Sequence, residues 1–226
     1  RISYPELTDK VKNSTGLALS PYFTGAKWGW MFLNEPRVVQ AQANNDLCLG
    51  TMDTWLVFQL TNGQSFKTEP SNACRTQLMN IKTGNWDQEL VEIFGIDIND
   101  LPDIVDSNSN FGETDLFGLL PHKIPILSVL GDSQAALFAH GCFETGDFKV
   151  TFGTGSSVML NIGKKLPNNF NNQLNTSLAW SINGQKSYVL EGNINYAGAC
   201  VTWLKDKLHL IQDPAETANL ALTANP

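Results

Sequence analysis

The chain has 226 residues, of which 42% are hydrophobic and 16% charged, and its formal net charge is −7. This length allows one large domain or two small ones around a buried core. The acidic balance argues against nucleic acid or an anionic membrane as the main partner, because both require a basic surface. The sequence has no bilayer-length apolar run and its first residues do not resemble a signal peptide, so we expect a cytoplasmic protein.

The first half of the chain is predicted to mix helices with short strands. Asp53 is expected to cap a helix over Thr54–Leu60, whose apolar residues form one face. A second helix is expected over Trp86–Phe94, with Asn85 as its cap.

A carboxylate follows the next apolar run. Ile124–Leu130 is predicted to form a strand and Ala135–Gly141 a helix, with Gly131-Asp132-Ser133 as the tight turn between them. A turn at a helix start holds the Asp132 carboxylate rigidly, beside backbone donors that favour negative charge.

The predicted secondary structure changes from mixed helices and short strands to mainly strands near Gly141-Cys142. We place a boundary there, between residues 1–141 and residues 142–226. Beyond it, Gly or Asn turns separate four predicted strands: Phe148–Phe152, Ser157–Ile162, Thr176–Trp180 and Ser187–Leu190. Two helices are expected after the strands, one from about Asn195 to Leu208 and one starting at Pro214.

The segment Gly153-Thr154-Gly155 is a glycine-flanked hydroxyl turn of the kind that cradles phosphate. On its own it is also the sequence of an ordinary hairpin turn, just as Asp132 alone would suit a helix cap. Together, a fixed carboxylate and a phosphate-sized turn outline a phosphoryl-transfer site. Two lobes that close on such a site would exclude water from the transferring group.

The four cysteines are scattered, with no Cys-x-x-Cys spacing: Cys48, Cys74, Cys142 and Cys200. This pattern predicts small buried thiols in a reducing compartment rather than disulfides or a zinc site.

Blocks of sequence across nearly the whole chain carry a family resemblance. In chain order they are Thr15-Gly16-Leu17 with Ser20-Pro21-Tyr22-Phe23-Thr24-Gly25-Ala26-Lys27, Gly50-Thr51-Met52-Asp53-Thr54-Trp55-Leu56, Ser71-Asn72-Ala73-Cys74-Arg75-Thr76, Gly131 to Phe138, Gly153-Thr154-Gly155, and Leu190-Glu191-Gly192 with Ala197-Gly198-Ala199 and Trp203-Leu204. In these blocks the chain resembles the FGGY carbohydrate kinases, and within that family it is most similar to the glycerol kinases.

The resemblance implies an α/β fold, part of the two-lobe, ribonuclease-H-like fold of actin-like ATPases. Residues 1–141 would form the later part of the N-terminal, substrate-side lobe, and residues 142–226 the beginning of the C-terminal, nucleotide-side lobe. Both ends of the chain look cut, so we expect a piece of a longer protein that is inactive alone. The implied cofactors are ATP and Mg²⁺, and the implied partner is a small polyol or sugar, with a homo-oligomer left open.

The resemblance also assigns site residues. Asp132 matches the general base that takes a proton from the attacking hydroxyl, and it would approach Mg²⁺ as well. The substrate-contacting positions are Tyr22, Asp132, Ser133 and Ser157. The ATP-contacting positions are Gly153, Thr154, Gly155, Gly198 and Thr202, although Gly198 and Thr202 would equally suit simple helix packing.

Two departures bear on the acceptor. Ser133 stands where glycerol kinases usually have glutamine, and Ser157 where they usually have a phenylalanine against the glycerol carbons. Shorter side chains leave room for more carbon atoms, and buried hydroxyls require polar partners.

The resemblance therefore predicts ATP-dependent phosphorylation of a primary hydroxyl of glycerol or a related polyol. The alternatives are a kinase for a larger polyol or ketose (erythritol, xylulose, ribulose or sedoheptulose) and a non-catalytic actin-like module that binds nucleotide or sugar.

Overall fold

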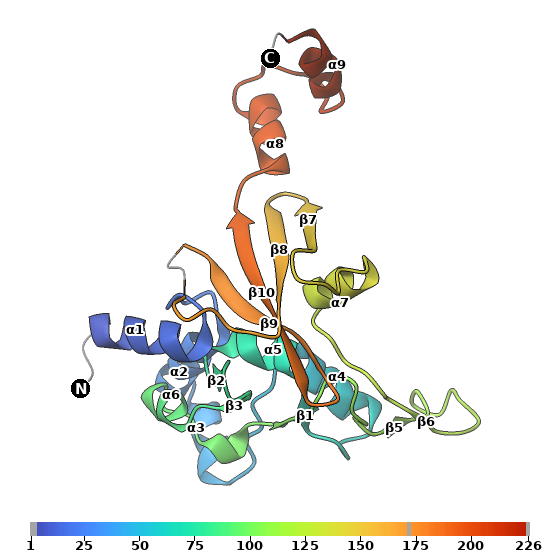
Figure 1. Cartoon of the computed structure of the whole chain (residues 1–226). Helices are drawn as coiled ribbons and strands as arrows, with labels where there is room; N and C mark the ends of the chain where they lie inside the picture. The colour runs from blue at the N-terminus through green and yellow to red at the C-terminus, as the bar shows by residue number, and fades with distance from the viewer. Residues whose placement is uncertain (1–3, 171–172, 225–226) are drawn as a thin grey trace.

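The computed structural model describes residues 4–170 and 173–224, which form a helical first part, a central antiparallel sheet and two helices beyond the sheet (Figure 1). The α-helices are α1 (Tyr4–Thr15), α2 (Thr24–Asn34), α3 (Pro36–Ala43), α4 (Met52–Leu60), α5 (Pro70–Ala73), α6 (Gln88–Ile93), α7 (Asp132–Ala139), α8 (Gly198–Asp206) and α9 (Glu216–Thr223). The strands are β1 (Lys67–Thr68), β2 (Met79–Asn80), β3 (Asn85–Trp86), β4 (Asp103–Ile104), β5 (Glu113–Thr114), β6 (Ile124–Pro125), β7 (Phe148–Phe152), β8 (Ser156–Gly163), β9 (Asn175–Ile182) and β10 (Gln185–Ile194). Two short 3₁₀ helices, η1 and η2, cover Cys74–Thr76 and Ile98–Asp100.

The predicted cap of α4 is wrong. The helix begins at Met52 with Thr51 as its N-cap residue, so Asp53 lies inside the first turn. Its carboxylate accepts hydrogen bonds from the hydroxyls of Thr51 and Thr68, the latter at 2.7 Å. The Asp53 carboxylate therefore binds the Thr68 hydroxyl on β1 instead of capping the helix.

The predicted cap of α6 is also wrong. Asn85 and Trp86 form β3, which pairs with Met79 and Asn80, so the helix begins only at Gln88. Asp87 is the N-cap, and its Oδ1 accepts a hydrogen bond from the Leu90 amide at 3.2 Å. The apolar residues do recur with a helical period, but Asn85 and Trp86, where the helix was predicted to start, pair in a strand instead.

The expected strand over Ile124–Leu130 is mostly irregular. Only Ile124 and Pro125 pair as a strand, with β5. Farther on, the Ile126 amide bonds to the Gly112 carbonyl at 2.8 Å and the Val129 amide to the Ser107 carbonyl at 3.1 Å. The segment leads into α7, which begins at Asp132 rather than at Ala135.

The second part is a four-stranded antiparallel sheet in the order β7-β8-β10-β9. All four predicted strands occur: β7 has its predicted bounds, and β8, β9 and β10 extend beyond them. The final helices begin later than predicted, at Gly198 instead of about Asn195, and at Glu216 instead of Pro214. The first delay has a cause in the sheet, because β10 continues to Ile194. None of the described helices is long and apolar enough to cross a membrane.

The sheet joins the first part through two cores on its opposite faces. Leu178 and Tyr188 pack with Ala73, Cys74, Met79 and Ile81 on one face. Met159 and Val189 pack with Leu137 of α7 on the other. The alternation of neighbouring residues between the two faces is the expected consequence of the strand period of two.

The end of α1 fixes the sheet edge. The buried Lys12 ammonium donates to the carbonyl of Gly16 at 3.1 Å and to that of Leu174 at 2.7 Å. The Thr176 amide donates to the Gly16 carbonyl at 2.9 Å. A Cβ on Gly16 would lie 2.4 Å from the Thr176 carbonyl oxygen, and Gly16 has φ of 75°, so both the close approach and the backbone require glycine.

All four cysteines are free, but only Cys74 and Cys142 are buried, so the prediction of buried thiols is wrong for Cys48 and Cys200. Burial raises the pKa of the Cys74 thiol to about 12, which makes that residue a packing group.

Candidate functional site

A pocket of about 480 Å³ lies between the β7–β8 turn and α8. It is lined by residues of that turn and of one face of the helix: Gly153, Thr154, Gly198, Ala199, Thr202, Trp203, Asp206 and Lys207. Four of the five predicted ATP residues therefore come together here, from segments more than forty positions apart in the sequence. Gly155, the fifth, lines the neighbouring pocket instead.

Backbone contacts hold α8 against the turn. The amides of Ala197 and Ala199 donate to the Thr154 carbonyl at 2.8 and 3.0 Å. The Gly198 amide donates to the Gly153 carbonyl at 2.9 Å, and a Cβ on Gly198 would lie 2.6 Å from that carbonyl oxygen. Glycine at this position is therefore required by the approach of two backbones, before any ligand is considered.

A second pocket, of about 690 Å³, lies over the face of the sheet that packs against α7. Its sheet side is lined by Thr151, Gly153, Gly155, Ser156, Ser157, Asn175, Glu191, Asn193, Ile194 and Asn195, and its other side by Ala18, Ser20, Tyr22, Phe23, Arg75 and Ser133. The predicted substrate residues Tyr22, Ser133 and Ser157 thus line a single pocket.

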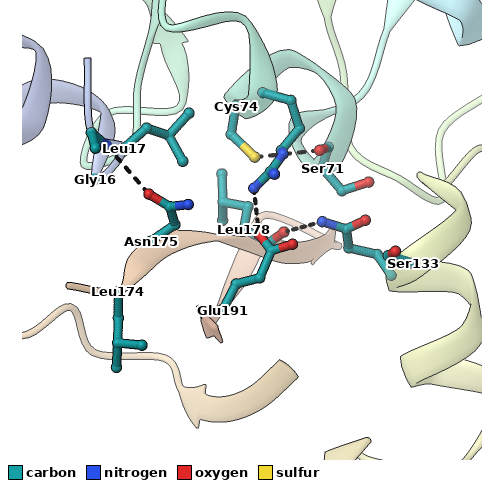
Figure 2. Close-up of polar contacts among 12 residues, drawn as sticks. Gly16, Leu17, Ser71, Cys74, Ser133, Leu174, Asn175, Leu178 and Glu191 are labelled. Atoms are coloured by element: carbon teal, nitrogen blue, oxygen red, sulfur yellow. Dashed lines mark hydrogen bonds and ion pairs between the residues drawn. The ribbon is translucent and has the colours of Figure 1, made fainter. Parts of the chain in front are cut away.

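An ion pair forms part of this pocket. Nη1 of Arg75 lies 2.6 Å from Oε2 of Glu191, whose side chain is only 9% exposed (Figure 2). The Arg75 guanidinium lies 5.1 Å from the centroid of the Phe23 ring, a cation–π contact. Tyr22 meets Phe23 edge to face at 5.3 Å and is itself exposed, so its ring stands at the mouth of the pocket.

Asn175 also lines the second pocket. Its Oδ1 accepts a hydrogen bond from the Ala18 amide at 3.3 Å, which places the first strand residue of β9 beside the chain after Gly16 and Leu17 (Figure 2). The chain after α1 and the first residue of β9 therefore meet at one side of the pocket.

Asp132 does not line the same pocket as the other predicted substrate residues. It lines a third pocket, of about 670 Å³, together with Asp53, Asn72, Ser128 and mainly apolar side chains. Asp132 and Ser133 are consecutive, so the start of α7 contributes one residue to each of these two pockets. The Asp132 side chain is exposed, and its Oδ1 accepts a hydrogen bond from the Ser133 amide at 2.6 Å.

A buried carboxylate holds the turn that carries Asp132. Glu69 is fully buried and accepts from the hydroxyl and amide of Ser71, from the amide and side chain of Asn72, and from the Ser107 hydroxyl. The Ser71 oxygen in turn accepts from the Gly131 amide at 2.9 Å. Burial raises the pKa of Glu69 above its ordinary value of 4.5, and the hydrogen bonds from Ser71, Ser107 and Asn72 oppose that rise.

Among the described residues, no group of three His, Cys, Asp or Glu side chains is arranged to hold a metal ion. Mg²⁺ in phosphoryl-transfer sites is usually held by one or two carboxylates together with substrate phosphates. The exposed Asp132 carboxylate fits that donor set.

Arg75, Glu191, Thr151, Asn175 and Asn193 line the pocket but were not identified from the sequence. Arg75 and Glu191 lie inside two of the sequence blocks that carry the family resemblance, so each could have been singled out from the sequence. Their contact could not be predicted from local sequence, because the two residues are 116 positions apart.

Comparison with known proteins identifies the family. Residues 1–139 match the N-terminal domain of the FGGY family of carbohydrate kinases. The glycerol kinase 1 of Thermotoga maritima is 48% identical over 217 residues, and the glycerol kinase of Bdellovibrio bacteriovorus is 47% identical over 216 residues. These matches cover 96% and 95% of this chain but only 44% and 43% of the two relatives. The chain therefore spans less than half of their length.

Solved structures show the same fold. The crystal structure of Plasmodium falciparum glycerol kinase with ADP superposes with a TM-score of 0.88 at 33% identity, covering 96% of this chain and 43% of that one. A ligand-bound xylulose kinase from Lactobacillus acidophilus has a TM-score of 0.81 at 19% identity over the same shares, which is a likeness of fold alone. The predicted actin-like ATPase fold is confirmed. The chain belongs to the FGGY family of carbohydrate kinases.

Proposed function

We propose that the intact protein transfers the γ-phosphoryl group of ATP to a primary hydroxyl of glycerol or a related polyol. The observation that supports this most is that the pocket at the β7–β8 turn and the polar pocket share Gly153, and that the polar pocket includes Ser133, the neighbour of Asp132. A phosphoryl donor in the first pocket and an acceptor in the second would meet near Gly153, which lines both.

In this proposal Asp132 is the general base. The acceptor hydroxyl gives its proton to the Asp132 carboxylate while its oxygen bonds to the γ-phosphorus, and the bond between that phosphorus and the ADP oxygen breaks. The Gly131 amide, held by Ser71 and Glu69, keeps the carboxylate in place, so little reorganisation is needed. The acceptor lies between Tyr22, Ser133 and Ser157, and the nucleotide phosphates lie against Gly153, Thr154, Gly155, Gly198 and Thr202.

Mg²⁺ bound to ATP would neutralise charge on the phosphates, with Asp132 as the protein carboxylate nearest to it. We also propose a lobe boundary near Gly141-Cys142, supported by the end of the family match at residue 139. A cytoplasmic location is part of the proposal and is supported by the four free thiols.

The proposal is tested by coupled ADP release from ATP-Mg²⁺ on the intact protein, with glycerol, erythritol, xylulose, ribulose and sedoheptulose. ADP release that requires one of these acceptors supports the kinase. Nucleotide binding with no ADP release on any acceptor would favour the non-catalytic module.

Replacing Gly198 with alanine should raise the KM for ATP about tenfold and leave the KM for the acceptor within twofold. The new methyl group would push α8 away from the Gly153 carbonyl, and displacements of about 1 Å in a binding site cost up to 100-fold. Steady-state kinetics on the variant would measure both constants. Gly192→Ala is the matched control, because its added Cβ meets only the Leu174 methyl at 3.4 Å. Equal KM values for ATP in both variants would contradict the nucleotide assignment.

A second candidate is a kinase of the same chemistry for an acceptor larger than glycerol. Its support is that Ser133 and Ser157 line one pocket and that the buried Oγ of Ser157 has no hydrogen-bond partner among the described residues. The double variant Ser133→Gln, Ser157→Phe should then shift the preference from the longer acceptors toward glycerol by about tenfold in kcat/KM. The ratio of kcat/KM values for glycerol and erythritol measures this, and an unchanged ratio would rule the candidate out.

A further inference from the structure

The ion pair in the polar pocket joins the two parts of the chain. Arg75 lies on η1 and Glu191 on β10, and the side chains of the two residues are only 25% and 9% exposed. A pair so far removed from water is screened less than a surface pair, and loss of one partner leaves the other charge buried. The pair therefore fixes the Arg75 guanidinium against the central sheet.

The guanidinium that Glu191 holds also lies over an aromatic ring. The Cζ atom of Arg75 is 5.1 Å from the centroid of the Phe23 ring, within the range of a cation–π contact. The Phe23 ring in turn meets the Tyr22 ring edge to face, with 5.3 Å between the centroids. Glu191, Arg75, Phe23 and Tyr22 thus form a continuous series of contacts, and all four line the 690 Å³ pocket.

The inner end of this series is firmly held. Cys74 and Thr76, which flank Arg75 in η1, are fully buried. The start of α2 packs directly against η1, because a Cβ on Gly25 would lie 2.8 Å from the Thr76 carbonyl oxygen. Phe23, the N-cap residue of α2, is itself 6% exposed. The backbone that carries Arg75 and the backbone that carries Phe23 are therefore fixed relative to each other.

The outer end of the series is held by its ring contacts. Tyr22 is 72% exposed, and its ring lies against the edge of Phe23 and 5.7 Å from the Lys27 ammonium. A mostly exposed side chain keeps several rotamers open unless neighbouring groups restrict it. The orientation of Phe23 therefore bears on the orientation of Tyr22, which the proposed function places against the acceptor.

We propose that Arg75 is a positioning residue for acceptor binding. Its guanidinium, held by Glu191, orients the Phe23 ring, and Phe23 orients the Tyr22 ring toward the acceptor. The ion pair thereby ties the position of Tyr22 to the sheet. This inference rests on the proposed kinase function and adds a role for Arg75 and Glu191, to which that proposal assigns none.

The test begins with the kinetics of two variants of the intact protein. Glu191→Gln weakens the hold on the guanidinium and keeps the side-chain shape. The double variant Arg75→Met, Glu191→Gln removes both charges, so no buried charge is left unpaired. Each should raise the KM for the acceptor about fivefold, the factor that corresponds to the loss of one cation–π contact. The KM for ATP and kcat should stay within about twofold.

The same substitutions are then made in a Tyr22→Phe background. This change removes the Tyr22 hydroxyl and keeps its ring. If Arg75 acts through Tyr22, the further rise in the acceptor KM should be less than about twofold, because residues that act through one another are not additive. A full fivefold rise in this background would overturn the inference, since it would mean that the pair acts on the acceptor without Tyr22.

A spectroscopic readout follows the Tyr22 ring without turnover. The intact protein is labelled with 3-fluorotyrosine, and the fluorine NMR signal of Tyr22 is the one missing from Tyr22→Phe. We expect this signal to shift by more than its linewidth in Glu191→Gln and in the double variant. An unmoved signal in both would overturn the inference, as would a fall in kcat with no change in the acceptor KM.

Glu89→Gln is the matched control, because it makes the same substitution in an ion pair with Lys10 on α1, where the Glu89 side chain is 63% exposed. It should change neither the acceptor KM nor the Tyr22 signal. Absence of ADP release with every acceptor would defeat the kinase proposal, and the fluorine signal would still show whether the ion pair orients Tyr22.

Discussion

Replacing Asp132 with asparagine will lower kcat about 10²- to 10⁴-fold, the contribution of a well-placed general base. Asparagine has the size of aspartate and can still accept the hydrogen bond from the Ser133 amide, so the start of α7 keeps its geometry. What is lost is the ability to take the proton of the acceptor hydroxyl. Steady-state ADP release at saturating ATP and acceptor measures the change.

The loss should be confined to turnover. Asp132 lines neither the pocket at the β7–β8 turn nor the polar pocket, so the Kd of ADP should stay within about twofold of its original value. Asp115→Asn, in an exposed turn where its Oδ1 accepts from the Gly118 amide, is the control and should keep full kcat. A variant at Asp132 with more than a tenth of the original kcat would remove it as the base.

Replacing Glu69 with glutamine will lower the free energy of unfolding at pH 7 by about 2–4 kcal/mol, because a carboxylate that accepts from five donors becomes an amide with one accepting atom. Donors of Ser71 and Ser107 then face an NH₂ group in a fully buried site. Urea unfolding measures the difference. Glu92→Gln, on the exposed face of α6, should cost less than about 0.5 kcal/mol.

The Glu69 effect also has a defined dependence on pH. Burial raises the pKa of Glu69 in the folded protein above 4.5. The pH-dependent part of its contribution to stability therefore adds in full to the hydrogen-bond part below pH 4.5, and it is lost as the pH rises through the folded pKa. The difference in unfolding free energy between the protein and Glu69→Gln should therefore grow as the pH falls from 7 to 4.5. A difference that shrinks over this interval would mean that the hydrogen bonds outweigh the burial.

Local sequence determined some elements and tertiary partners determined others. β7 was predicted with its observed bounds because its apolar and polar residues lie between Gly146 and the Gly153 turn. The predicted helix start at Asn85 was wrong because Asn85 and Trp86 pair with β2, and no local sequence pattern predicts that pairing. Asp53 failed as a cap for a related reason, since the Thr68 hydroxyl, fifteen positions away, binds its carboxylate.

The sequence blocks predicted part of the candidate site. The turn Gly153-Thr154-Gly155 and the residues Gly198 and Thr202 were expected to be near one another, and the fold places Gly153 and Thr154 in one pocket with Gly198 and Thr202. The neighbours of Ser157 in the polar pocket were not predictable, because Thr151 and Asn193 come to lie beside it only through the register of β7, β8 and β10. The separation of Asp132 from the other predicted substrate residues was likewise set by packing at the start of α7.

The most direct measurement is the mass of the product formed when the intact protein is incubated with ATP-Mg²⁺ and each acceptor in turn. The account predicts an acceptor that has gained one phosphoryl group at a primary hydroxyl, with one ADP formed per product, and no such species with Asp132→Asn over the same time. ADP binding without any phosphorylated acceptor, from glycerol to sedoheptulose, would contradict it.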